Sequence, residues 1–110
     1  MQTTDFTTLR CEYLDDVLRV TIDHPTSALN AVDERLHHDL TALCAGLRRE
    51  TRARAVVLTG RGRAFSAGGD FAWFPTLREP ERLEALRRDA KQMIWDLLDV
   101  EVPIVAAVNG

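Results

Sequence analysis

The chain has 110 residues, with 14 Lys or Arg against 17 Asp or Glu, which gives a formal net charge of -3. Hydrophobic residues make up 45% and charged residues 28%, and these ordinary globular values exclude intrinsic disorder, collagen-like repeats and a disulfide scaffold. The near balance of charge, without a cluster of Lys and Arg, argues against a nucleic-acid partner.

No apolar run approaches the roughly 20 residues that span a bilayer, so no membrane partner is expected. Residues 1–8 lack the basic start and apolar run of a signal peptide, and we therefore expect a cytoplasmic protein. Cys11 and Cys44 lie on separate predicted elements and form neither a redox pair nor a metal-ligand pair. We expect both to be buried, reduced thiols.

The first predicted element is a β-hairpin. Apolar and polar residues alternate over 9–13 and again over 18–22, with a turn at residues 14–16 between them. The second strand is expected to end at residues 24–25 (His-Pro), because proline has no N–H to donate and restricts the residue before it. A loop over residues 26–32 follows.

A helix is predicted next, with Asp33 as its N-cap. Its apolar residues recur at helical spacing: Leu36, Leu40, Leu43, Cys44 and Leu47. Its polar face is expected to carry Arg35, Asp39, Arg48 and Arg49. The apolar run 55–59, bounded by Gly60, predicts a strand buried on both faces. Strand, helix and strand in this order imply a right-handed parallel crossover.

A glycine-rich connection over residues 60–70 leads to the aromatic stretch 71–74. A second helix is predicted from Glu79-Pro80 to about Asp99, because proline is tolerated in a first turn. Its buried stripe is expected to comprise Leu83, Leu86, Ala90, Met93 and Leu97. The wholly apolar run 104–108 predicts a fourth strand, the third buried one, covered on both faces. Because the sequence stops just after this strand, we expect residues 1–110 to be the N-terminal part of a single domain, truncated after its third buried strand.

The common nucleotide and nucleophile motifs do not match. A Walker A loop fails because no lysine follows the glycines, and the dinucleotide fingerprint fails because Phe65 stands where a small residue is required. Ser66 lacks the glycine that a nucleophile elbow has two residues earlier, since Ala64 occupies that position.

The three histidines form no metal motif and are expected to be solvated or partly packed: His24, His37 and His38. The sequence therefore predicts no metal site.

The backbone of the glycine-rich loop is the remaining candidate for chemistry. Gly68 and Gly69 let a main-chain N–H approach a ligand closely, and such groups stabilise a developing oxyanion. A tight turn without a ligand remains the alternative. For Asp70 the favoured interpretation is a carboxylate that caps free N–H groups at the start of a turn.

Three segments, in order and separated by one predicted helix each, resemble signatures of the enoyl-CoA hydratase/isomerase (crotonase) family. They are residues 27–31 (Ser-Ala-Leu-Asn-Ala), 65–70 (Phe-Ser-Ala-Gly-Gly-Asp) and 102–110 (Val-Pro-Ile-Val-Ala-Ala-Val-Asn-Gly). The resemblance implies an α/β fold of the crotonase-like ββα superhelix type, a parallel sheet with covering helices, of which this is a partial chain. It also implies an acyl-CoA thioester substrate whose enolate oxygen is held by two backbone N–H groups.

Carried over to this sequence, the resemblance makes the N–H of Gly69 one oxyanion donor. It implies substrate binding by two groups of residues: Ser27, Ala28 and Leu29, and Ala67, Gly68, Gly69 and Asp70. The second donor and the acid-base carboxylates would lie beyond residue 110. The aromatic stretch 71–74 is a hypothetical lining of the acyl pocket.

The implied activity is hydration or isomerisation of an enoyl-CoA. Other reactions of the family, such as decarboxylation or thioester hydrolysis, stay open, and so does a non-catalytic acyl-CoA-binding role. No cofactor is implied, because CoA is part of the substrate. The resemblance also implies a homo-oligomer, a trimer or hexamer, for the full-length protein.

Overall fold

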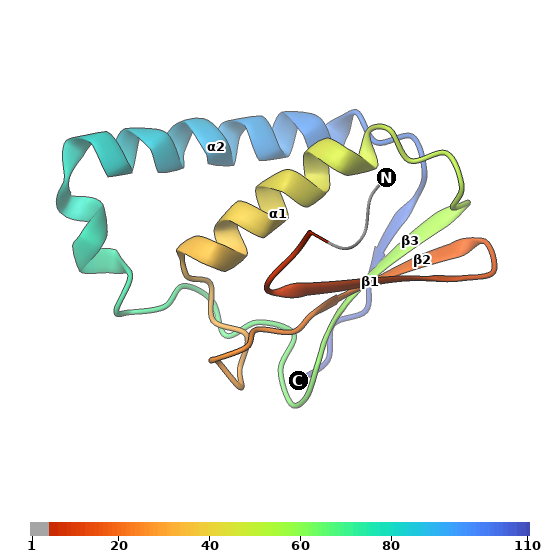
Figure 1. Cartoon of the computed structure of the whole chain (residues 1–110), viewed down its shortest axis with the longest axis horizontal. Coiled ribbons are helices and arrows are strands. Elements are labelled where there is room, and N and C mark those ends of the chain that lie inside the picture. The colour runs from red at the N-terminus through yellow and green to blue at the C-terminus, as the bar shows by residue number, and fades with distance from the viewer. Residues whose placement is uncertain (1–4) are drawn as a thin grey trace.

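The computed structural model describes residues 5–110. Its elements are β1 (Leu9–Leu14), β2 (Val17–Ile22), α1 (Glu34–Leu47), β3 (Ala55–Gly60), the short 3-10 helix η1 (Phe74–Arg78), α2 (Pro80–Leu98) and β4 (Ile104–Ala106). The strands form one sheet in the order β1-β2-β3-β4, in which β1 and β2 are antiparallel and the other neighbours are parallel. This arrangement confirms the predicted hairpin, the parallel crossover and the α/β class (Figure 1).

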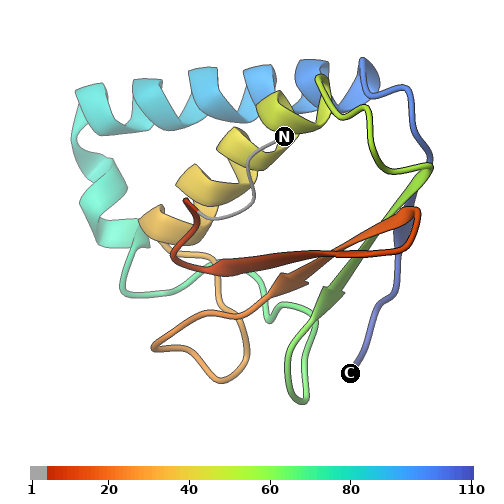
Figure 2. The ribbon, with the colours of Figure 1, turned by 45° about the vertical axis from the view of Figure 1, so that its right-hand side comes forward.

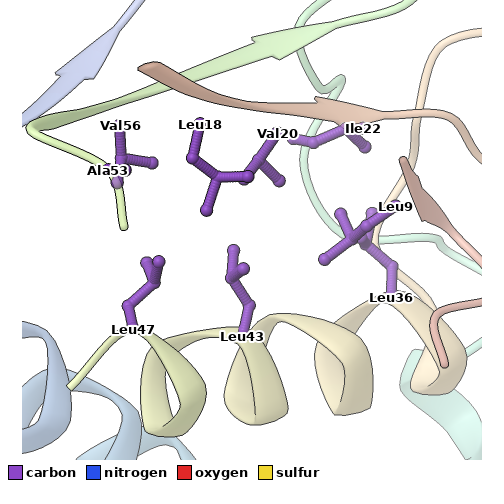
Figure 3. Close-up of a cluster of buried hydrophobic side chains, with 9 residues drawn as sticks. All are labelled: Leu9, Leu18, Val20, Ile22, Leu36, Leu43, Leu47, Ala53 and Val56. Carbon is purple, nitrogen blue, oxygen red and sulfur yellow. The ribbon is translucent and has the colours of Figure 1, made fainter. Parts of the chain in front are cut away.

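The sheet, α1 and α2 lie in three successive layers, with α1 in the middle (Figure 2). Side chains of α1 point toward those of the sheet and form the hydrophobic core with them (Figure 3). The core comprises Leu9, Leu18, Val20, Ile22, Leu36, Leu43, Leu47, Ala53 and Val56. The predicted apolar stripe of α1 therefore provides most of the contact between the helix and the sheet.

The prediction that the third and fourth strands are buried on both faces is wrong for this chain. In β3 only Val56 is buried, and in β4 Val105 is 55% exposed. Both helices lie on the same side of the sheet, so within residues 5–110 no helix covers its other side (Figures 1 and 2). The last strand is also shorter than predicted: β4 ends at Ala106, although the N–H of Ala107 still donates to the carbonyl of Leu58 at 2.8 Å.

The start of α1 agrees with the prediction, whereas its polar face does not. Asp33 caps the helix, since its Oδ1 accepts the N–H of Leu36 at 3.0 Å. Asp39 was expected on the polar face but is only 8% exposed. Its Oδ2 accepts the N–H groups of Thr7 and Thr8, at 3.0 and 2.8 Å, and the Thr8 hydroxyl at 2.7 Å. These three donors compensate the burial of the carboxylate and hold the segment before β1 against the helix.

The orientation of α2 also differs from the prediction. Leu83 and Leu97 of the expected buried stripe are 42% and 40% exposed. Ion pairs between Arg82 and Glu34, and between Arg48 and Asp96, each at 3.2 Å, join the two helices. The side of α2 that faces α1 is therefore centred on Arg82 and Asp96. The other three residues of the predicted stripe, Leu86, Ala90 and Met93, are half-buried at the edge of this contact. The long helix packs on another helix through a partly polar seam.

No helix in the described part of the chain is long and apolar enough to cross a membrane. Both cysteines are free thiols, Cys44 buried and Cys11 half-buried. Burial raises the pKa of each thiol to about 11. Neither thiol is therefore activated as a nucleophile.

Candidate functional site

The glycine-rich loop lies alongside the loop that precedes α1. The N–H of Ala67 donates to the carbonyl of Leu29 at 2.9 Å, and the N–H of Val32 donates to the carbonyl of Gly68 at 2.7 Å. The N–H of Asp70 then donates to the carbonyl of Val32 at 2.8 Å. These bonds form a short parallel ladder that brings together two segments some 35 residues apart.

The ladder fixes the direction of the Gly69 backbone. Val32 is paired with Gly69, but it bonds to the groups of Gly68 and Asp70. In a parallel ladder the intervening residue turns its own N–H and C=O away from the partner strand. Within residues 5–110 the N–H of Gly69 has no hydrogen-bond acceptor. A free main-chain donor therefore lies at the position that the sequence predicted.

Glycine is favoured at both positions of the pair, for different reasons. Gly68 has a φ of +96°, a backbone conformation that L side chains rarely adopt. At Gly69 an added Cβ would lie 2.5 Å from Cζ of Phe74, so the phenyl ring occupies the space a side chain would need. The Phe74 ring in turn makes an edge contact with Phe71, with 5.9 Å between ring centroids. An aromatic pair thus borders the free N–H.

Trp73 belongs to a separate hollow of about 220 Å³ between α1, η1 and α2. Its indole ring lies 5.8 Å from the imidazole ring of His37, centroid to centroid. Leu77 and Leu86 also line this hollow, whereas Phe71 and Phe74 do not. The aromatic stretch that the sequence suggested as one pocket wall is therefore divided between two places.

The predicted residues before α1 lie close to the end of β2. Ser27 and Ala28 line a hollow of about 240 Å³ together with Asp23 and Arg61, which form an ion pair at 3.0 Å. The hydroxyl oxygen of Ser27 accepts the N–H of Ala31 at 3.0 Å and stabilises the turn. The structure thus places the two predicted groups of residues on neighbouring stretches of the same pair of loops.

The side chains of Ser66 and Asp70 are both engaged in local structure. The hydroxyl of Ser66 donates to the carbonyl of Asn30 at 2.8 Å and accepts the N–H of Gly68 at 3.2 Å. Asp70 Oδ1 accepts the N–H of Ala72 at 3.0 Å, which confirms the capping interpretation. Neither side chain is arranged as a nucleophile or a general base.

The histidine prediction is wrong for His24 and correct for the other two. His24 is 8% exposed; its Nε2 lies 2.9 Å from Oδ2 of Asp33, and its Nδ1 accepts the N–H of Thr26 at 3.1 Å. Because both ring nitrogens have polar neighbours, the ring is tolerated in the interior. His37 is partly packed, and burial lowers its pKa, while His38 is exposed. Residues 5–110 contain no cluster of His, Cys, Asp or Glu that could hold a metal ion.

Comparison with known proteins identifies the family. The sequence model described as "Enoyl-CoA hydratase/isomerase" matches residues 12–110. The chain belongs to the enoyl-CoA hydratase/isomerase family. It is 36% identical over 104 residues to a protein of Rhodobacter capsulatus described as "Probable enoyl-CoA hydratase", and this match covers 94% of the chain and 38% of that relative.

Solved structures confirm the crotonase fold. An enoyl-CoA hydratase/isomerase from Mycobacterium paratuberculosis matches with a TM-score of 0.86 and 37% identity, over 96% of this chain and 43% of that one. A β-diketone hydrolase from the cyanobacterium Anabaena matches with a TM-score of 0.84 and 28% identity, over 97% and 43% of the two chains. The chain therefore spans about two fifths of the length of its relatives, which include proteins named for different reactions.

Proposed function

We propose that the intact protein binds an acyl-CoA thioester and that the N–H of Gly69 donates a hydrogen bond to the thioester oxygen. The observation that carries this proposal is the unpaired N–H itself, held by a ladder that uses the neighbouring groups on both sides. The loops that would flank the substrate contain the residues the resemblance assigns to substrate binding. The family supports the same substrate class.

The chemistry would depend on stabilising charge on oxygen. When a proton leaves the carbon next to the thioester carbonyl, or a nucleophile adds to the conjugated double bond, electrons move onto the thioester oxygen. A fixed N–H at hydrogen-bond distance from that oxygen stabilises the enolate without reorganising, and one such donor contributes about 3 kcal/mol to lowering the barrier. A second donor and the groups that move protons would come from residues after Gly110.

Hydration or isomerisation of an enoyl-CoA is the proposed reaction, because the family model and the relative from Rhodobacter capsulatus carry these names. Thioester hydrolysis is the second candidate, because one structural neighbour is named a hydrolase, although for a β-diketone and not for a thioester. A non-catalytic protein would bind acyl-CoA through the same loops without converting it to a product.

Assays of the intact protein with a 2-enoyl-CoA and with a 3-enoyl-CoA separate these reactions. Hydration removes the absorbance of the conjugated thioester and releases no thiol, whereas hydrolysis releases free CoA. Isomerisation of a 3-enoyl-CoA creates the conjugated absorbance. Binding of the thioester that free CoA displaces, without any product, would indicate a binding protein. Absence of both binding and product would overturn the proposal.

We also propose that the acyl group extends toward the hollow lined by Trp73. Replacing the indole by a methyl group enlarges this hollow, so Trp73→Ala is expected to raise kcat/KM for longer acyl chains relative to short ones. Trp95→Ala is the matched control, since Trp95 is 64% exposed and does not line the hollow. An acyl-chain-length profile unchanged in Trp73→Ala would contradict this part of the proposal.

A further inference from the structure

Two side-chain amides, in addition to main-chain hydrogen bonds, hold the loop after β3. Asn30 is only 2% exposed, and its Nδ2 donates to the carbonyls of Arg61 and Ala64, at 3.2 and 2.9 Å. Its Oδ1 accepts the N–H of His24 at 3.0 Å. One buried amide thus satisfies three main-chain groups from two different segments.

A second amide holds the start of the same loop. Asn109 Oδ1 accepts the N–H of Gly60 at 3.0 Å, and its Nδ2 donates to the carbonyls of Gly60 and Gly62, at 2.8 and 3.1 Å. The main-chain carbonyl of Asn109 also accepts the N–H of Phe65 at 2.6 Å. The chain that leaves β4 is thereby joined to the chain that leaves β3, beyond the last residue pair of the sheet.

Asn30 is connected to the free donor through one hydroxyl group. Its carbonyl accepts the Ser66 hydroxyl, and the same hydroxyl oxygen accepts the N–H of Gly68, the residue directly before Gly69. Asn30 itself has a φ of +54°, a left-handed conformation that asparagine adopts more readily than most residues. Asn30 therefore hydrogen-bonds to the loop through its side-chain amide, at Arg61 and Ala64, and through its main-chain carbonyl, at Ser66.

We propose that Asn30 and Asn109 are positioning residues: by fixing the loop over residues 60–68, they support the ladder that sets the direction of the Gly69 N–H. This inference rests on the proposed function. The argument is geometric: a displacement of about 1 Å at a reacting centre reduces the rate on the order of 100-fold, and the two amides donate four hydrogen bonds to this loop in addition to its main-chain bonds. Neither side chain is required to touch the substrate.

The test uses Asn30→Asp and Asn109→Asp in the intact protein. Aspartate keeps the shape and the tolerance of a left-handed backbone, but it replaces the two donated hydrogen bonds of each amide with a carboxylate oxygen facing two carbonyls. The matched control is Asp39→Asn, which perturbs an equally buried polar cluster on α1 that does not touch the loop. Ser66→Ala is a second, more exposed variant that breaks only the link between Asn30 and Gly68.

Two readouts separate positioning from a loss of stability. We expect kcat to fall on the order of 100-fold in both Asp variants and about tenfold in Ser66→Ala, with KM nearly unchanged in each. We also expect the shift of the thioester carbonyl stretch on binding to shrink in these variants, as measured by Raman difference spectroscopy with a saturated acyl-CoA thioester, an analogue that has no double bond to hydrate or isomerise. The control should keep both values at temperatures below its Tm.

These measurements distinguish failure of the positioning role from failure of the proposed function. If the unsubstituted protein shows no carbonyl shift with the acyl-CoA analogue, the proposed function and this inference both fall. If it shows the shift, but the folded Asp variants keep both the shift and kcat, only the positioning role is overturned. If the Asp variants do not fold, an unchanged shift and kcat in Ser66→Ala overturns it equally.

Discussion

At the scale of single residues, two carboxylates with little exposure each combine a main-chain donor three residues away with a side-chain neighbour from another segment. Asp33 caps α1 and also lies against His24, while Glu50 accepts the Tyr13 hydroxyl at 2.6 Å and the N–H of Ala53 at 2.6 Å. Burial raises the pKa of each carboxyl, but the hydrogen bonds lower it further than burial raises it. The ionised form of each is therefore favoured by folding.

These lowered pKa values predict acid sensitivity. A carboxyl whose pKa is lower in the folded state adds stability above its ordinary pKa, 3.8 for Asp33 and 4.5 for Glu50, and that stability is lost as the pH falls through the lowered values. The free energy of unfolding, measured with urea between about pH 7 and pH 3, should fall toward acid, and less steeply in Glu50→Gln. The same pH dependence in both proteins would show that Glu50 does not contribute.

Sequence rules predicted those residues whose role is local. The cap at Asp33, the turn at Asp70 and the exposed backbone at Gly69 each follow from the few residues around them. His24 was misplaced although its polar neighbours Thr26 and Asp33 are near in sequence, because the residue types do not show that the loop between them closes around the ring. Asp39 was misplaced because its donors, Thr7 and Thr8, lie far away along the chain, and a carboxylate gives no sign in the sequence that such donors exist. The amides of Asn30 and Asn109 were missed for the same reason.

At the scale of elements, hydrophobic periodicity predicted every strand and both long helices, and it predicted the buried face of α1 correctly but not that of α2. The stripe of α2 was misassigned because helix-to-helix packing uses ion pairs with α1 in addition to apolar contact. The 3-10 helix η1 escaped prediction because its residues, Phe74–Arg78, show no period and include a proline. The type of an element thus depends mainly on the local sequence, whereas the direction that a helix faces depends on its tertiary contacts.

The contact between α1 and the segment before β1 depends on Asp39. In Asp39→Ala the N–H and hydroxyl of Thr8 lose their acceptor in the interior, and the free energy of unfolding is expected to fall by about 3 kcal/mol. Thr41→Ala on the same helix loses only a bond to the carbonyl of His37 one turn away and should cost about 1 kcal/mol or less. Equal losses in the two variants, measured by urea unfolding, would refute this role.

At the scale of the whole molecule, helices cover one side of the sheet, and within residues 5–110 no helix covers the other side (Figures 1 and 2). The uncovered side of the sheet and the outer side of α2 carry large apolar side chains, with Val105, Val108, Trp95 and Leu98 between 55% and 71% exposed. Patches of this kind favour association with other apolar surfaces. The sequence predicted that residues 104–108 need cover, and the described chain does not supply it.

A polypeptide of residues 1–110 produced by itself should therefore associate. Light scattering is expected to increase with its concentration, and it should bind a hydrophobic dye more strongly than the intact protein does. Replacing Val105 and Val108 by Thr keeps β-branched side chains while lowering apolar exposure, and should reduce both signals. A monomeric polypeptide that binds no dye would contradict this expectation.

The central claim concerns one N–H group, and a pair of substitutions at Gly69 tests it most directly. Gly69→Ala keeps the N–H and requires only that the partly exposed Phe74 ring shift, whereas Gly69→Pro removes the N–H. With the two proteins matched for folding by circular dichroism, kcat/KM for an acyl-CoA thioester is predicted to fall on the order of 100-fold or more in the proline variant relative to the alanine variant. Equal turnover by both variants would contradict a role for the Gly69 N–H in catalysis.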